Sequence, residues 1–413
     1  MSELASEPSI PRGPLTGVRV LDFTWVGAGS FTTKLLADHG ADVIKVESAK
    51  ALDSLRVGAP FAGGIKGVNR SGYFAERNTS KRGITLNLKD PRAQEIARDL
   101  AAGADVVANN FRPGVMDRFG LGYEQVRAVN PRVVYLSMSM QGATGPDKDH
   151  LGYGLTIGAL VGLTHLTGLP DRYPVGTGTN YPDHVPNPCH AAFAVLAALR
   201  HVRRTGQGQL IDIAQTEPTI AAIGPAILEW TVNGVDPAPL GNAHPAWCPH
   251  GIYRCAGADE WLAIAVRTDD EWRVLADELL LDDVPPQWTY APGRRADAAA
   301  VDAAVRRRIA TWRAEDAMAV LQERGVPAGV VRDVAGLVRH DPQLAHREHW
   351  QRLPHAEMGR SLYGAPPFTL SDTPGGLRAA APLLGEHTRE VLTELLDLSD
   401  AEITELAESD VLT

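Results

Sequence analysis

An aspartate that precedes a long alanine-rich segment is the residue best suited to covalent chemistry in this sequence. Asp183 lies between Pro182 and Pro186, and Cys189 to Leu199 are almost wholly Ala, Val, Leu and Phe, which predicts a buried helix. A carboxylate just ahead of a helix lies near partial positive charge, so we expect Asp183 to stay ionised and to be available as a nucleophile. The alternative interpretation is a loop aspartate that caps a turn.

Candidate ligand-binding residues follow three short apolar segments that are predicted to be strands. They lie at Val26 to Ala28, Leu86 to Lys89 and Asn110 to Gly114. Ligands of open parallel sheets bind beyond the carboxyl ends of the strands, so Lys89, Arg112 and Arg118 are candidates to hold phosphates together. Phe111 could line the wall of an adenine or pantetheine pocket. The alternative for each of these side chains is an ordinary surface residue.

Two further ligand motifs are incomplete. Gly27-Ala28-Gly29, with Glu47 20 residues after Gly27, resembles a dinucleotide-binding fingerprint, but Thr32 replaces its third glycine. His244 and His250 have no third ligand at a usual spacing, so no metal site is predicted. Both histidines are expected to shape a turn or to face a cleft.

The elements that would position these residues alternate between short apolar segments and helix-forming ones, which is typical of an α/β protein with a doubly wound parallel sheet. Strands are predicted at residues 18–26, 42–47, 84–88, 105–109, 133–138 and 209–213. Helices are predicted at residues 31–39, 91–102, 123–129, 155–166, 189–199 and 218–232. Residues 51–77 are predicted to form a loop that could cover a site.

The pattern changes near residue 233, where a smaller α+β domain is predicted to begin. Its predicted elements are a strand at 261–266 and helices at 270–281 and 297–324. After residue 342, β-like segments at 350–353 and 368–370 precede an amphipathic helix at 382–396. We therefore predict a large domain at residues 1–232, a small domain at 233–335, and a return at 336–413 that completes the large domain.

Length and composition set the remaining bounds. A chain of 413 residues is too long for one ordinary core, and 44% hydrophobic with 22% charged residues is typical of a soluble globular protein. A formal net charge of −10 without a long Lys/Arg run disfavours a nucleic-acid surface. The three cysteines form no CxxC pair, and neither a secretory leader nor a run of 18 apolar residues is recognisable, so a cytoplasmic protein that spans no membrane is expected.

Five stretches, in order along nearly the whole chain, together resemble a known family. They are residues 17–47 (GVRVLDFTWVGAGSFTTKLLADHGADVIKVE), 78–91 (NTSKRGITLNLKDP), 104–139 (from ADVVANNFRPG to VVYLSMS), 205–213 (TGQGQLIDI) and 382–392 (PLLGEHTREVL). The family is the class III coenzyme A transferases, which include formyl-CoA transferase and carnitine CoA-transferase. An ordered set of this kind is far more specific than any single stretch.

The resemblance implies a large doubly wound domain assembled from both chain ends, a small domain from the middle, and a homodimer whose subunits are interlocked like links of a chain. It also implies that Asp183 is the nucleophile and that a coenzyme A thioester is a substrate, with no permanently bound cofactor and no metal. The CoA-contacting positions that it implies are Val26, Gly27, Ala28, Leu86, Lys89, Asn110, Phe111 and Arg118.

Two positions depart from formyl-CoA transferase. Ser48 stands where that enzyme has a basic residue after the second strand, and Gly154 stands where it has an acid after a tyrosine. The phosphates of CoA are therefore expected to be held differently, and the acyl pocket is not expected to be that of formyl-CoA transferase. The stretch HPAWCPH at 244–250 is a candidate lining for the acyl pocket.

The chemistry expected of such a protein is CoA transfer from an acyl-CoA donor to a carboxylic acid acceptor. The aspartate would form a mixed anhydride with the acyl group and then a thioester with CoA, and the acceptor acid would take the CoA by the reverse steps. Glycine-rich loops would exclude water, and N–H groups of Gly27 to Gly29 could stabilise the oxyanion.

Three alternatives remain open. A 2-methylacyl-CoA racemase needs a base, usually a histidine followed by an aspartate, but the corresponding place reads Gly152-Tyr153-Gly154, with His150 displaced. An NAD-dependent oxidoreductase would rest on the partial glycine fingerprint alone. A CoA-binding module without activity is the third alternative.

Overall fold

The structure is a computed structural model that describes residues 13–281 and 284–413. Its internal contacts define two compact units. Of the described residues, unit 1 contains those up to Thr164 together with Gly176–Val235 and Leu344–Thr413, and unit 2 contains His165–Val175 and those between Asp236 and Gln343. The assignment of residues 1–232, 233–335 and 336–413 to domains stays a prediction.

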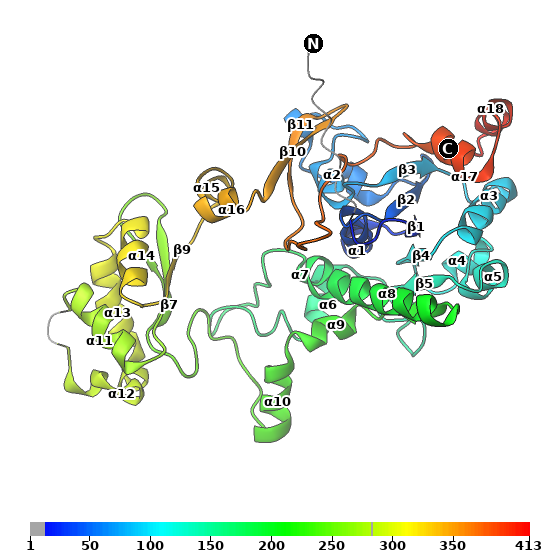
Figure 1. Cartoon of the computed structure of the whole chain (residues 1–413). Coiled ribbons are helices and arrows are strands. Elements are labelled where there is room, and N and C mark those ends of the chain that lie inside the picture. The colour runs from blue at the N-terminus through cyan, green and yellow to red at the C-terminus, as the bar shows by residue number, and fades with distance from the viewer. Residues whose placement is uncertain (1–12, 282–283) are drawn as a thin grey trace, which may run out of the picture. The chain divides into compact units, whose positions relative to one another are not determined.

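Unit 1 is built around a six-stranded sheet in which every neighbouring pair is parallel (Figure 1). Its strands are β1 (Arg19–Asp22), β2 (Asp42–Glu47), β3 (Arg82–Thr85), β4 (Val106–Asn109), β5 (Val134–Ser137) and β6 (Gln209–Asp212). They lie in the order β3-β2-β1-β4-β5-β6, so the direction of winding reverses between β1 and β4. The α/β class is confirmed, and ligands of such sheets bind where the winding reverses.

Helices cover both faces of this sheet. Val20 and Val43 belong to one apolar cluster, whereas their neighbours Leu21 and Ile44 belong to another, because successive side chains of a strand point to opposite faces. The first cluster includes residues of α1 (Val26–Asp38) and α8 (Pro186–Thr205), and the second includes residues of α3 (Pro91–Ala102), α5 (Tyr123–Val129), α17 (Thr388–Leu396) and α18 (Asp400–Glu408). Both ends of the described chain therefore contribute to one sheet core.

Shorter elements complete unit 1. They are α2 (Gly72–Arg77), α4 (Val115–Arg118), α6 (Gly154–Leu160), α7 (Tyr181–His184), α9 (Thr216–Ala221), α10 (Gly224–Asn233), 3-10 turns at Ser54–Val57 and Ala62–Gly64, and the antiparallel pair β10 (Trp350–His355) and β11 (Gly359–Gly364). Helix α16 (Pro342–His346) spans the boundary between the units in sequence.

Unit 2 is a smaller α+β body with its own core. Its antiparallel sheet has the order β7 (His250–Arg254), β8 (Trp261–Ala265) and β9 (Ala328–Val330). Its helices are α11 (Asp269–Glu278), α12 (Ala291–Ala296), α13 (Ala298–Ile309), α14 (Ala314–Glu323) and α15 (Val334–His340), with a 3-10 turn at Pro286–Thr289. Trp272 and Trp288 pack edge to face in the core, with ring centroids 6.0 Å apart.

The first strand and helix differ from their prediction in a way that bears on function. The strand predicted at 18–26 ends at Asp22, and the helix predicted at 31–39 begins at Val26. Gly27 to Gly29 therefore form the first turn of α1 rather than a loop before it. The apolar residues after Asp22 belong to the turn between β1 and α1, which side chains from other elements hold.

Other predicted elements also differ. The loop predicted at 51–77 contains helix α2, and the helix predicted at 218–232 is divided into α9 and α10, with a proline in the first turn of α10. The segment 368–370 is not a strand, since Pro366 and Pro367 before it lack the N–H groups of a ladder. In the described ranges, no helix is long and apolar enough to cross a bilayer.

Candidate active site

Asp183 lies in α7, a single helical turn that directly precedes α8. Val185, with φ −126° and ψ −74°, separates the two helices, and prolines occupy the first turn of each. A proline at that place costs no hydrogen bond, because the first N–H groups of a helix have no partner within it. The side chain of Asp183 is buried, with 3% of its surface exposed.

Two glycines bring the backbone close to this carboxylate. The N–H of Gly154 donates to Oδ2 of Asp183 at 3.1 Å. A Cβ atom at Gly154 would lie 2.9 Å from the same oxygen, and a Cβ at Gly27 would lie 3.0 Å from the Asp183 Cβ. The replacement of an acid by Gly154 thus leaves room for this hydrogen bond, which a side chain there would obstruct.

Burial governs the ionisation of Asp183. Loss of solvent raises the pKa of its carboxyl to about 6, although the Gly154 N–H and the charge of Arg77 act to lower it. The start of the helix was expected to stabilise the charged form of Asp183, but the effect of burial on its pKa is larger. Because this pKa still lies below 7, most of the carboxyl groups are ionised at neutral pH.

His184 and Tyr73 lie beside Asp183, and neither was singled out from the sequence. Burial lowers the pKa of His184 to about 4, so the imidazole is neutral at pH 7. Its Nε2 atom lies 3.3 Å from the Tyr73 hydroxyl, and its Nδ1 is buried without a hydrogen-bond partner in the described structure. A Cβ at Gly27 would lie 3.4 Å from the His184 ring, so Gly27, Asp183 and His184 form one packed group.

Asp183 opens on a cavity of about 220 Å³. The sequence-predicted residues that line this cavity with it are Val26, Gly27, Ala28, Asn110, Phe111 and Arg112. Further lining comes from Trp25, Val115, Ser139, Met140, His150, Leu151, Gly152, Tyr153 and Gln215, which sequence reasoning did not select. The carboxyl ends of β1, β4 and β5 thus converge with α7 on one site, as the reversal of winding predicts.

A second cavity of about 230 Å³ adjoins the first, since Trp25, Phe111 and Val115 line both. It contains the predicted residues Leu86 and Lys89. Its other lining residues are Phe23, Val46, Glu47, Ser48, Lys50, Ala51, Asn87, Leu88 and Phe119. Arg118, exposed at the end of α4, lines neither cavity, so the structure does not bring it together with the other predicted residues.

Lys50 is the basic residue that sequence reasoning missed. It follows the uncharged Ser48 by two positions and lines the second cavity with Lys89. Its Nζ forms an ion pair with Asp410 at 3.0 Å, and both side chains are largely exposed. The signal that could have identified Lys50 is its closeness in sequence to Ser48, which stands where formyl-CoA transferase has a basic residue.

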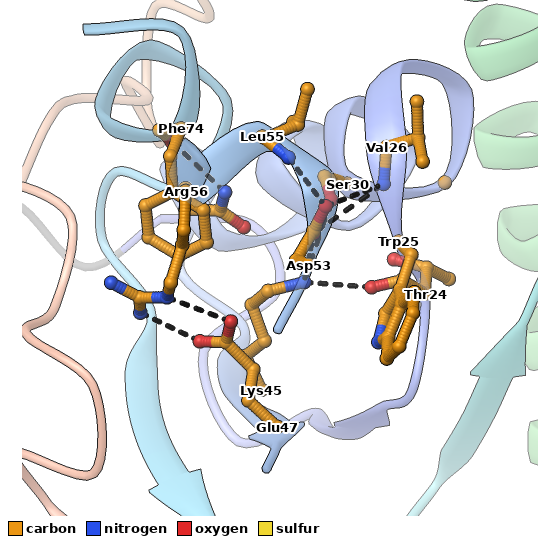
Figure 2. A network of polar contacts seen from close by, with 12 residues as sticks. Thr24, Trp25, Val26, Ser30, Lys45, Glu47, Asp53, Leu55, Arg56 and Phe74 are labelled. Atoms are coloured by element: carbon orange, nitrogen blue, oxygen red, sulfur yellow. Dashed lines mark hydrogen bonds and ion pairs between the residues drawn. The ribbon is translucent and has the colours of Figure 1, made fainter. Parts of the chain in front are cut away.

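The glycine-rich turn and Glu47 do not form a dinucleotide site in this structure. Glu47 is buried and accepts two hydrogen bonds from the Arg56 guanidinium, at 2.8 and 2.6 Å (Figure 2). Gly29 is needed for another reason, because a Cβ there would lie 2.5 Å from the Thr24 side chain and 2.9 Å from that of Asn110. Glu47, the acidic residue of the partial fingerprint, therefore forms a structural ion pair with Arg56 and is not available to a ribose hydroxyl.

The two histidines considered for a metal lie in unit 2 and stack with an aromatic residue. The rings of His244 and Trp247 lie 4.1 Å apart, and His250 approaches both. The Nδ1 atom of His250 lies 2.6 Å from the Asn242 carbonyl oxygen. Within the residues that the structure describes, no cluster of three or more potential ligands could hold a metal ion.

Comparison with known proteins decides the class of this site. A sequence model of CoA-transferase family III matches residues 15–388. The chain belongs to CoA-transferase family III. It is 34% identical to succinate–glutarate CoA-transferase of Agrobacterium fabrum, over 92% of this chain and 96% of that protein. It is 35% identical to acetyl-CoA:oxalate CoA-transferase of Acetobacter aceti, over 82% of this chain and 86% of that protein.

A solved structure supports the same assignment. The crystal structure of a CAIB/BAIF family protein from Brucella suis matches with a TM-score of 0.84 and 31% identity, over 93% of this chain and all of that one. Membership of family III makes the protein a CoA-transferase that moves CoA between acyl-CoA esters and carboxylic acids. The predicted family and enzyme class are confirmed.

Proposed function

We propose that Asp183 transfers CoA by covalent catalysis. Its carboxylate attacks the thioester carbonyl carbon of the donor, the C–S bond breaks, and CoA leaves as a thiolate while Asp183 becomes a mixed anhydride. The thiolate then attacks the Asp183 carbonyl carbon, which releases the donor acid and leaves an aspartyl-CoA thioester. The acceptor carboxylate attacks this thioester, and the thiolate returns to the acceptor carbonyl, which restores Asp183 and gives the new acyl-CoA.

The observation that carries this proposal is a buried, largely ionised carboxylate that opens on a cavity at the strand ends. Burial protects an anhydride or thioester from water, and a pKa of about 6 makes Asp183 more basic than an exposed aspartate while it remains charged at pH 7. The N–H groups of Gly27 and Ala28 belong to the first turn of α1, where no partner exists within the helix, so they are suited to the oxyanion.

We further propose that the CoA donor extends from one cavity into the other. The thioester end lies beside Asp183, and the adenine and phosphate end lies along the second cavity between Lys50 and Lys89. Lys50 supplies the positive charge that Ser48 cannot, and the shared wall of Trp25 and Phe111 contacts the pantetheine arm. Arg112 is available at the rim of the first cavity.

We propose that the acceptor is a short dicarboxylic acid and that the acyl group of the CoA donor derives from one. The relatives above are named for succinate and glutarate and for acetyl-CoA and oxalate. A further family III enzyme from Chloroflexus aurantiacus, 32% identical over 96% of this chain and 97% of that protein, is named for succinyl-CoA and D-citramalate. Succinyl-CoA is therefore the first donor to test, against a mass-spectrometric panel of mono- and dicarboxylic acceptors.

Trapping of the covalent intermediates tests the nucleophile. Wild-type protein incubated with succinyl-CoA and then hydroxylamine should carry a hydroxamate on the peptide that contains Asp183, detected by mass spectrometry. Asp183→Asn should show no label and should lose roughly 10⁴-fold or more of the transfer rate, since removal of a covalent nucleophile has effects of this order. Transfer by Asp183→Asn at the wild-type rate, or a label on another residue, would refute the assignment.

We propose that the active protein is an interlocked homodimer. In unit 1, Phe193 of α8 and Trp230 and Val232 of α10 are 74, 59 and 74% exposed, which is unusual for large apolar side chains of a monomer. A second copy of the chain would cover them. Sedimentation equilibrium should give twice the chain mass of 44.3 kDa, and a concentration-independent monomer would contradict the proposal.

A further inference from the structure

The turn between β1 and α1 ends at a strained residue, Val26, which is also the first residue of α1. Val26 has φ +59°, in the left-handed region that β-branched residues rarely adopt. Such a conformation persists only where the surrounding structure imposes it. The N–H of Val26 donates to Oδ1 of Asp53 at 3.2 Å, and the same oxygen accepts from the Leu55 N–H at 3.0 Å (Figure 2).

A buried lysine holds Asp53 in place. The Nζ of Lys45 lies 3.4 Å from Oδ2 of Asp53, and neither side chain is exposed. The same Nζ donates to the carbonyl oxygen of Thr24 at 2.7 Å, so Lys45 connects Asp53 to the start of the turn (Figure 2). Burial favours the neutral amine, but Asp53 and the other nearby carboxylates outweigh it and raise the pKa of Lys45, so the charge is retained.

Asn110 fixes the residue between these two contacts. Its side chain accepts from the Trp25 N–H at 2.8 Å and donates to the Trp25 carbonyl oxygen at 2.7 Å. The side chains of Lys45, Asn110 and Asp53 thus form hydrogen bonds with four backbone groups in a row. These groups are the Thr24 carbonyl, the N–H and carbonyl of Trp25, and the Val26 N–H. The conformation of this turn is set by contacts that come from three other segments of the chain.

The strained residue directly precedes the glycine that packs against the nucleophile. A Cβ at Gly27 would lie 3.0 Å from the Asp183 Cβ, so the Gly27 backbone is already in contact distance of Asp183. Val26 and Gly27 both line the cavity of Asp183, whereas Asp53 is not among the described residues that line either cavity. Asp53 is therefore placed to act on the reaction through the backbone that it holds rather than by contact with the substrate.

We infer that Asp53 is a positioning residue for CoA transfer, which holds the left-handed turn at Val26 and thereby sets the Gly27 and Ala28 N–H groups against Asp183 and the bound thioester. The inference rests on the proposed nucleophilic role of Asp183. Loss of Asp53 allows Val26 to relax toward negative φ, which moves Gly27 away from the reacting atoms. A displacement of about 1 Å at a reacting site costs on the order of 100-fold in rate.

A double-mutant cycle between Asp53 and Val26 tests this inference. Asp53→Asn should lower kcat of transfer from succinyl-CoA by about 10- to 100-fold, with KM within about 3-fold because the second cavity is untouched. Val26→Gly adopts the same φ without strain, so in that background Asp53→Asn should lower kcat by less than about 3-fold. A purely structural Asp53 would give the same loss in both backgrounds, and that result would overturn the inference.

Asp38→Asn is the matched control. Asp38 lies at the other end of α1, is 3% exposed and pairs with the buried Lys34, so the substitution again removes a buried carboxylate beside a lysine. The hydrogen bonds to its carboxylate come from Lys34 and Thr79, neither of which belongs to the turn between β1 and α1. Asp38→Asn should lower the melting temperature and leave kcat of the folded protein within about 2-fold of wild type.

The remaining outcomes also decide between explanations. If Asp53→Asn alone does not fold but Val26→Gly with Asp53→Asn folds and transfers CoA, the role in the turn stands. If neither chain folds, Asp53 supports the core rather than the turn, and the inference is wrong. Failure to trap an acyl group on Asp183 in the wild type would instead refute the proposed function, independently of this cycle.

Discussion

Asp22 and Asp183 are buried carboxylates of the same unit in opposite electrostatic surroundings. Asp22 is fully buried, and it accepts hydrogen bonds from Lys81 Nζ at 3.0 Å and from the hydroxyls of Thr24 and Thr33 at 2.6 Å each. Burial alone would raise its pKa, but Lys81, Lys45 and the hydroxyls outweigh burial, so the pKa of Asp22 falls below its usual value.

Asp183 has no comparable partners. Within residues 13–281 and 284–413, no side chain donates a hydrogen bond to its carboxylate and no cation forms an ion pair with it, so the Gly154 N–H and the more distant Arg77 leave burial uncompensated. The comparison teaches that burial does not determine the role of a carboxylate. The carboxylate with cations around it is tied into the core by ion pairs and hydrogen bonds, and the one without them is the proposed nucleophile.

The largest predicted effect is on folding stability. The two Asp→Asn substitutions should change the free energy of unfolding in opposite directions, and changes in the same direction would contradict the comparison. Asp22→Asn leaves Lys81 buried without its carboxylate and should lower the free energy of unfolding by about 3–5 kcal/mol. Asp183→Asn removes a carboxyl group whose pKa is raised to about 6, and at pH 7 it should raise the free energy of unfolding by roughly 3 kcal/mol.

Chemical denaturation of both variants at pH 7 and pH 4 measures these values. The raised pKa of Asp183 means that its protonated form favours folding, so this contribution is complete below about pH 3.8 and is lost as the pH rises through about 6. The gain from Asp183→Asn should therefore shrink toward zero at pH 4. A gain that is the same at both pH values would show that charge is not its cause.

The next effect is on rate as a function of pH. If Asp183 is the nucleophile as proposed, only its ionised form can attack the thioester, so kcat/KM for the donor should level off above about pH 6 and fall tenfold for each pH unit below it. The lowered pKa of Asp22 keeps its ion pair intact in this range, so circular dichroism should show a folded protein while activity falls. A profile that is flat from pH 7 to pH 5 would contradict the raised pKa.

The smallest predicted effect on stability concerns an exposed ion pair, Lys50 with Asp410, which extends the comparison from buried carboxylates to the surface. Lys50 and Asp410 are 45 and 69% exposed, so Lys50→Ala should change the free energy of unfolding by less than about 1 kcal/mol. The same variant should raise KM for succinyl-CoA by about 3- to 10-fold, most strongly at low salt, because the proposed contact with a CoA phosphate is lost. Asp410→Asn is the control, and an unchanged KM in Lys50→Ala would exclude the proposed phosphate contact.

The parts of the fold that could be predicted are those with local signals. Helix α3 matches its predicted bounds because Asp90 caps it and Pro91 occupies its first position, and β2 matches because a short apolar run stands between polar ends. The position of Asp183 ahead of α8 was likewise readable, since the prolines and the alanine-rich segment are adjacent in sequence.

The parts that could not be predicted depend on distant residues. The strand predicted through Val26 stops at Asp22 because Lys45, Asp53 and Asn110 bind the next backbone groups, and these residues lie 21 to 85 positions away from the groups that they bind. The raised pKa of Asp183 depends on burial by other elements, which no local pattern reports. The proposed role of Lys50 likewise rests on the cavity that it lines, which brings it beside Lys89.

The sparse surroundings of Asp183 also bear on the order in which substrates enter. A free carboxylic acid is an anion at neutral pH, and in the resting enzyme it would meet a second negative charge, since no cation of the described residues forms an ion pair with Asp183. If Asp183 becomes acylated as proposed, that charge disappears and the repulsion with it. The site would then admit the acceptor only after the donor has reacted, so the electrostatics of one side chain would impose a ping-pong sequence without a moving gate.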